Sequence, residues 1–175
     1  MSETFEDMLT GGHPNSLGCT IEVVETVLDD VDRMAELFQC YSSADEIVRL
    51  RVSNAMRRVQ SERPDLIQPY VDRLIEEIGA LDQPSAQWTL PKLFERADLT
   101  TDQAAKALAI VKRNLAEHGD WIVLNNSIDY LVPLAVRDRS LRDWIIPHLE
   151  RHSRDQRKSV RSRALKGLKR LGGSS

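Results

Sequence analysis

Residues 48–59 read VRLRVSNAMRRV, and the pattern in this stretch decides the fold. Counted from Val48, small or apolar side chains follow at offsets of 4, 7, 8 and 11, which trace one face of a helix. The same offsets recur after Ala86, Val123 and Val160, so the four anchors are spaced by 38, 37 and 37 residues. A fixed period of this length predicts stacked helix pairs, because one pair cannot bury its apolar stripe alone.

Capping residues and prolines divide the rest of the chain into helices. Ser43 stands three residues before Glu46, which is the spacing of a capping box. Arg63 ends the long helix because the residue before Pro64 avoids the helical region. We expect further caps at Thr101, Asp120 and Asp155, one at Asp29 or Asp30, and helices at about 21–28, 31–38, 46–61, 64–78, 84–97, 101–117, 120–136, 140–152 and 156–171.

Two of the aligned segments resemble the second helix of a HEAT repeat. Each has an upstream acid, then Val-Arg, then small residues at helical spacing: Asp45, Val48-Arg49, Val52 and Ala55-Met56 in one, and Asp155, Val160-Arg161, Ala164 and Gly167-Leu168 in the other. The units with Ala86 and Leu124 lack the Val-Arg pair, and the period is shorter than usual for HEAT. Armadillo-like or irregular helical-hairpin packing would produce similar columns.

The resemblance covers residues 43–171 and implies an all-α fold, a right-handed α-α superhelix. It would form a short HEAT-like solenoid of about four to five helix pairs in a single domain over 1–175. Its expected parts are an N-terminal arm and loop (1–19), a degenerate capping repeat (20–41), three helix pairs (43–82, 83–118 and 119–154) and a basic C-terminal helix (155–171).

Composition bounds the class of protein. The 175 residues are 41% apolar, 29% charged and only 5% aromatic, which suits a helical core. No apolar run approaches the ~18 residues that span a bilayer, and the acidic N-terminus does not resemble a secretory signal. We therefore expect a cytoplasmic protein without membrane contact, in which Cys19 and Cys40 are reduced core thiols.

Motifs that would carry catalysis are incomplete. His148 and His152 share a helix face, but Glu150 is displaced by one position from the zincin pattern. The loop Gly11–Gly18 has no phosphate-binding lysine and no preceding strand, so it either lets the acidic arm fold back or is simply flexible. The sequence thus favours a non-enzymatic protein with no metal and no cofactor.

Polar columns on the second helices form the candidate partner-binding surface on the concave side that the resemblance implies. Its residues are Arg51, Asn54, Arg58, Trp88, Lys92, Arg96, Asn126, Asp129, Arg163 and Lys166. An ordinary solvated face is the competing interpretation. The first functional hypothesis is a protein-interaction module that takes an acidic or extended segment of a partner protein.

The charge distribution supports a second hypothesis, nucleic-acid binding. Residues 1–50 hold eleven acids against two arginines, whereas residues 151–175 hold nine basic residues against one acid. A variant of this hypothesis is a base-excising glycosylase of HEAT-like shape, with Asp129 near Trp88 and Trp121. Head-to-tail self-association through the opposed charges is a third possibility.

Overall fold

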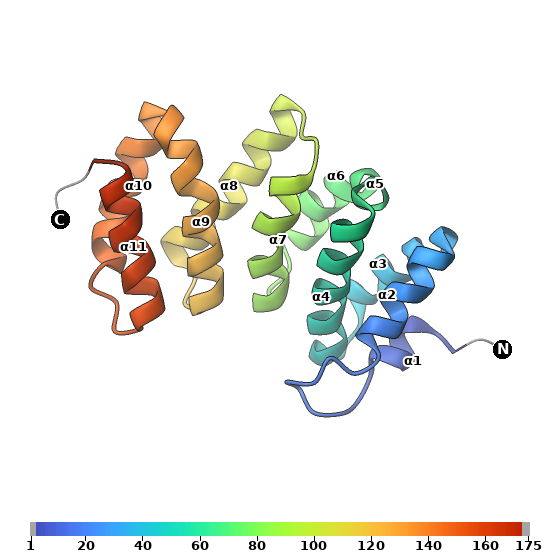
Figure 1. Cartoon of the computed structure of the whole chain (residues 1–175). Coiled ribbons are helices and arrows are strands. Elements are labelled where there is room, and N and C mark those ends of the chain that lie inside the picture. Colours follow the sequence, from blue (N-terminus) through green and yellow to red (C-terminus); the bar gives the residue numbers. More distant parts are fainter. Residues whose placement is uncertain (1–2, 173–175) are drawn as a thin grey trace. The chain divides into compact units, whose positions relative to one another are not determined.

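The computed structural model describes residues 3–172, and all regular structure in this range is helical (Figure 1). The all-α prediction is therefore confirmed. No helix of the described range is both long enough and apolar enough to cross a membrane. The chain divides into two compact units, residues 1–103 and 104–175, and the boundary falls inside one helix, α8 (Thr101–Glu117).

Unit 1 is built around one long helix, α4 (Glu46–Glu62), which packs against α2 (Thr20–Asp29) and against α7 (Pro84–Arg96). The chain before and after α4 is broken into short turns. These are α1 (Phe5–Leu9), η1 (Val31–Arg33), α3 (Met34–Gln39), η2 (Cys40–Ser42), α5 (Pro64–Ile67), η3 (Gln68–Tyr70), α6 (Val71–Arg73) and the π-type turn η4 (Leu74–Ile78).

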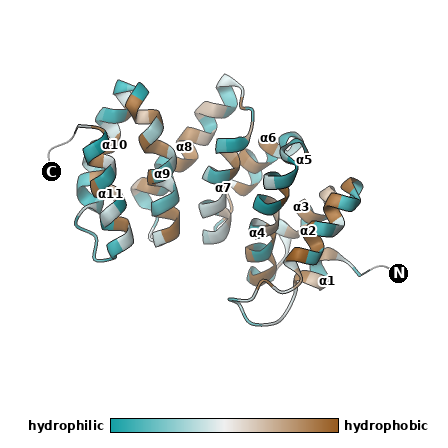
Figure 2. Ribbon diagram, in the orientation of Figure 1, coloured by the Kyte–Doolittle hydropathy of each residue, from teal (hydrophilic) through white to brown (hydrophobic). Residues whose placement is uncertain are grey.

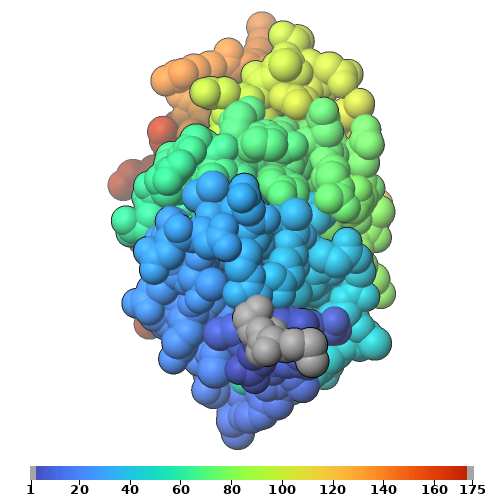
Figure 3. Space-filling model, turned by 90° about the vertical axis from the view of Figure 1, so that its right-hand side faces the viewer, coloured from blue at the N-terminus to red at the C-terminus, as the bar shows by residue number. Residues whose placement is uncertain are grey.

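The N-terminal segment is part of the core of unit 1, as the fold-back alternative for the loop required. Phe5 and Leu9 are fully buried, and the backbone N–H of Phe5 donates to a carboxylate oxygen of Glu36 at 2.7 Å. Figure 3 shows this end of the molecule, where the first residues after the grey ones lie against α2 and α3. The acidic arm thus closes the end of the unit.

Unit 2 consists of most of α8 together with α9 (Trp121–Arg137), α10 (Arg139–His152) and α11 (Lys158–Arg170). The last three helices all contact one another. Gly167 of α11 packs tightly against both other helices, because a Cβ there would lie 3.0 Å from Val132 of α9 and 3.2 Å from Leu149 of α10.

The repeat pattern read from the sequence is the buried pattern of both units, as the brown inward faces in Figure 2 show. All four anchors are buried, and so are the residues eight positions on, namely Met56, Phe94, Leu131 and Leu168. The column at offset 11 departs from this, since Leu134 is 42% exposed. Helix periodicity therefore located the core.

Three predicted caps are wrong by one or two residues. Asp45, not Ser43, caps α4, with its carboxylate accepting from the backbone N–H of Ile47 at 2.8 Å. Thr100, not Thr101, precedes α8 and exchanges hydrogen bonds with Gln103 in a capping box. In both cases the residue directly before the helix supplies the acceptor, and the donor is a backbone N–H two or three residues further on. Asp155 does not cap α11, whose N-cap residue Arg157 makes no side-chain cap hydrogen bond.

Asp120 caps α9 as predicted, accepting from the backbone N–H groups of Ile122 and Val123.

The two cysteines lie in different environments, one buried and one exposed. Cys40 is buried, and burial together with the charges of Glu6 and Glu36 raises the pKa of its thiol to about 11. Cys19 is exposed, so the prediction that it is a core thiol is wrong.

Candidate binding surfaces

Arg51 is the most unusual side chain of unit 1, because its cation is buried without a carboxylate. It is 2% exposed and reaches back to the loop that follows α1. Its guanidinium donates four hydrogen bonds to backbone carbonyl oxygens, at 2.6 Å to Leu9 and Gly11, 3.2 Å to Ser16 and 3.3 Å to His13. Residues 9–16 thus wrap around a single cation.

Glycine makes this wrapping possible. Gly11, Gly12 and Gly18 all have positive φ, a backbone conformation that costs other residues strain. A Cβ at Gly18 would also lie 2.7 Å from a guanidinium nitrogen of Arg51. The loop is therefore a fitted cover over Arg51, and the interpretation of the loop as simply flexible is not supported by these contacts.

The structure does not place Arg51 on an accessible surface, where the sequence prediction had put it. Four of its five N–H donors bond to the loop, and almost none of its surface faces solvent. The signal was present in the sequence as three glycines within eight residues, but no local pattern connects that loop to a position 40 residues downstream.

Unit 1 carries two adjoining grooves beside α4. The groove between α2 and α4 has a volume of about 550 Å³, and the groove between α4 and α7 has about 260 Å³. Arg57 and Ser61 line both. The predicted residues Asn54 and Arg58 line the first groove, and Lys92 and Arg96 line the second.

The α2–α4 groove combines apolar and charged side chains. Ile21, Val24 and Leu28 line it from α2, and Ile21 is 37% exposed. Glu25 and Glu62 line it together with the two arginines Arg57 and Arg58. Such a mixture suits a segment that has both apolar and charged side chains.

The cations that line the two grooves make few side-chain hydrogen bonds within unit 1. Arg58 donates to the amide oxygen of Asn54 at 2.6 Å, and Arg96 donates to the hydroxyl of Ser61 at 3.2 Å. None of the groove cations, namely Arg57, Arg58, Lys92 and Arg96, forms an ion pair among the described residues. Trp88 is half-buried on α7 and lines neither groove.

Unit 2 has one groove of a different character, between α9 and α11, with a volume of about 290 Å³. The predicted residues Asp129, Arg163 and Lys166 line it, and Arg170, which the sequence did not single out as a site residue, joins them. The Asp129 carboxylate lies 3.4 Å from the Arg163 guanidinium. Asn126 is half-buried on α9 outside the groove.

No aromatic side chain lines the α9–α11 groove. Trp121 is 48% exposed at the start of α9 and lies outside the groove lining. The aromatic cleft that a glycosylase would need around Asp129 is therefore not formed by the described residues of unit 2.

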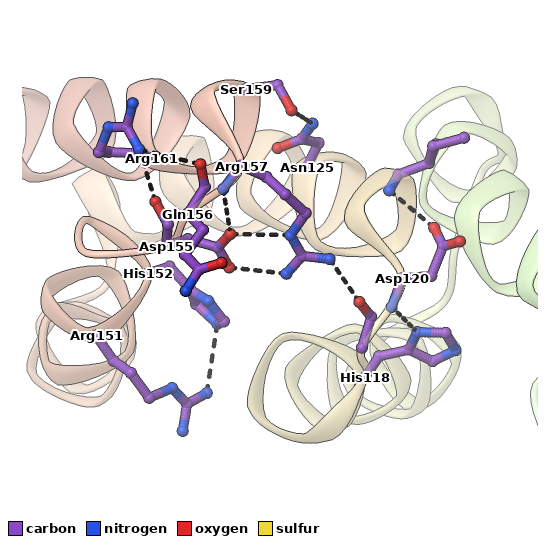
Figure 4. A network of polar contacts seen from close by, with 12 residues as sticks. His118, Asp120, Asn125, Arg151, His152, Asp155, Gln156, Arg157, Ser159 and Arg161 are labelled. Atoms are coloured by element: carbon purple, nitrogen blue, oxygen red, sulfur yellow. Dashed lines mark hydrogen bonds and ion pairs between the residues drawn. The ribbon is translucent and has the colours of Figure 1, made fainter.

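Other basic residues of unit 2 hold its loops together (Figure 4). Arg157 makes a two-pronged contact with Asp155 and donates to the carbonyl oxygen of Gly119 at 2.7 Å. Its hydrogen bond lowers the pKa of the Asp155 carboxyl to about 2. Arg161 donates to the carbonyl oxygens of Asp155 and Gln156, so it holds the loop that precedes its own helix.

The histidine pair is structural. His152 is buried, and its Nε2 lies 2.9 Å from the carbonyl oxygen of Leu115 at the end of α8. His148 stacks against Trp144 instead, with ring centroids 4.2 Å apart. Burial lowers the pKa of both imidazoles. Within residues 3–172 no group of three potential ligands is placed to hold a metal ion.

The two units differ sharply in charge. Unit 1 contains twenty Asp and Glu against nine Lys and Arg, a net charge of −11. Unit 2 contains seven acids against fifteen bases, a net charge of +8. The net charge of −3 for the whole chain conceals this separation between the units.

Comparison of the chain with protein-family models, with curated proteins and with solved structures finds no match.

Proposed function

We propose that the protein is a non-enzymatic interaction module, built from HEAT-like helix pairs, that binds an extended segment of a partner protein on unit 1. The observation that carries the proposal is the pair of adjoining grooves beside α4, which share Arg57 and Ser61. Four of the residues that the repeat register selected line these two grooves.

The chemistry of the grooves indicates the kind of segment. Ile21 and Leu28 offer apolar contact, while Arg57, Arg58, Lys92 and Arg96 offer cations. An extended chain with acidic side chains flanking apolar ones would satisfy both. Charge complementarity of this kind sets specificity and association rate more than affinity.

A library of displayed random peptides, panned against the full chain, tests the proposal. We expect enriched peptides to combine Asp or Glu with apolar residues. Arg57→Glu should weaken their binding about 5–30-fold, since reversing one charge in a contact changes the binding free energy by about 1–2 kcal/mol.

Arg63→Glu is the matched control. Arg63 follows α4 directly, pairs only with the exposed Asp65 and lines none of the grooves described above. It makes the same change in net charge and should leave binding unchanged. Peptides without acidic residues, or equal losses in both variants, would contradict the proposal.

A further inference from the structure

The α9–α11 groove of unit 2 is lined by three cations and one acid, namely Arg163, Lys166, Arg170 and Asp129. Its apolar lining residues Ile128 and Val132 are 2% and 5% exposed, whereas Pro133 is exposed. The groove also belongs to a unit with a net charge of +8, whereas the grooves beside α4 belong to a unit with a net charge of −11. The charge around the α9–α11 groove therefore favours an anionic ligand.

The spacing of the three cations along α11 agrees with an anionic ligand that carries regularly spaced charges. Arg163, Lys166 and Arg170 stand at i, i+3 and i+7 on α11, so they share one side of the helix and span about 10 Å along its axis. A nucleic-acid strand in a duplex carries one phosphate per ~3.4 Å of axis. About three successive phosphates would face three cations.

Two of these three cations, Lys166 and Arg170, are also available, whereas Arg163 is paired with Asp129. Arg151, Arg157 and Arg161 are engaged by carbonyl groups or by Asp155. In contrast, the groove residues Lys166 and Arg170 have no hydrogen bond or ion pair within the described range. Uncompensated charge of this kind attracts phosphate through the release of counterions.

We propose that unit 2 binds the phosphate backbone of a nucleic acid in the α9–α11 groove, without reading base sequence. The absence of aromatic side chains from the groove lining favours backbone contact over base stacking. Asp129 opposes the ligand, because its carboxylate lies in the same groove beside Arg163.

The test is fluorescence anisotropy of labelled single-stranded and duplex DNA of mixed sequence, titrated with the full chain at several salt concentrations. Neutralising about three phosphates predicts a slope of log K against log salt near −2 for single strands and near −3 for duplex. Binding of either form supports the proposal and identifies the form preferred. No anisotropy change at low salt overturns it.

Two variants and a control separate groove binding from bulk charge. Lys166→Glu/Arg170→Glu should lower affinity at least about tenfold and flatten the salt slope, because two phosphate contacts are lost. Arg139→Glu/Arg154→Glu changes net charge equally at exposed positions outside the groove and should have much less effect. Equal losses in both double variants overturn the proposal.

Asp129→Asn keeps the proposal testable if the double variant fails to fold. Removing this carboxylate should strengthen binding about two- to fivefold, as one repulsive charge near a phosphate is lost. Unchanged or weaker binding contradicts the proposal. Light scattering on the same samples detects the alternative occupant, the acidic unit 1 of a second copy, and a salt-sensitive dimer without DNA binding overturns the proposal.

Discussion

Replacement of Arg51 by methionine tests the main structural finding in unit 1. Methionine keeps an unbranched apolar stem of similar length but donates no hydrogen bond. The carbonyl oxygens of Leu9, Gly11, His13 and Ser16 then lose their common donor. The loop of residues 10–19 loses the contact that holds it against α4.

The magnitude follows from the contacts. The two bonds of 2.6 Å join a charged donor to carbonyl groups, and such bonds contribute about 1.5–3 kcal/mol each. The two longer bonds add less. Methionine also avoids the cost of burying a cation, which offsets part of the loss. We therefore expect the free energy of unfolding to fall by about 2–4 kcal/mol.

Urea unfolding followed by circular dichroism measures the global effect, and thermolysin measures the loop. Leu17 is 40% exposed in the loop and provides a cleavage site. If cleavage tracks the open population, a loss of 2 kcal/mol raises its rate about thirtyfold. Gly18→Ala should act in the same direction by about 1–2 kcal/mol, because its φ is +51° and its Cβ would meet Arg51.

Arg57→Met is the matched control, since Arg57 lies on the same helix but is exposed. It should change the free energy of unfolding by no more than about 0.5 kcal/mol. If Arg51→Met unfolds at the same urea concentration as the control and its loop is cleaved no faster, the carbonyl cage does not stabilise the fold.

Three further predictions concern the rest of the chain. Burial lowers the pKa of His152, so its neutral form stabilises unit 2 at pH values above the unfolded pKa of about 6.5, and this stability is lost as the pH falls below that value. The urea midpoints at pH 7.5 and pH 5.5 should therefore differ less in His152→Gln than in the unsubstituted protein. An equal difference in the two proteins would refute this. Gly167→Leu should destabilise by about 1–3 kcal/mol through overpacking, whereas Gly119→Ala meets no atom within 4 Å and should be nearly neutral in the same melts. Ellman's reagent at pH 8 should modify Cys19 alone in the native protein, because Cys40 is buried with a pKa of about 11; rapid reaction of both thiols would contradict the assignment.

Helix positions and the buried columns could be read from the sequence because their signals are local. A cap acts within three residues, a proline restricts its predecessor, and periodicity needs only one helix to become visible. Asp120 and the anchor Val160 illustrate this, since each lies where the pattern placed it. Some boundaries failed by one or two residues, as at Asp45 and Thr100. The predicted single helix over 64–78 is instead divided into four short elements, and the helix α1 was not predicted.

The contacts that individual cationic side chains make could not be predicted in this way. Arg51 and Arg58 occupy equivalent polar positions on α4, yet Arg51 is caged by a loop that precedes it by 35 to 42 residues and Arg58 faces a groove. Arg161 and Lys166 differ likewise on α11. The sequence alone determined where the helices and their apolar faces lie. Only the tertiary structure decided which cations are consumed by distant backbone carbonyls, because those contacts depend on how the chain returns in space.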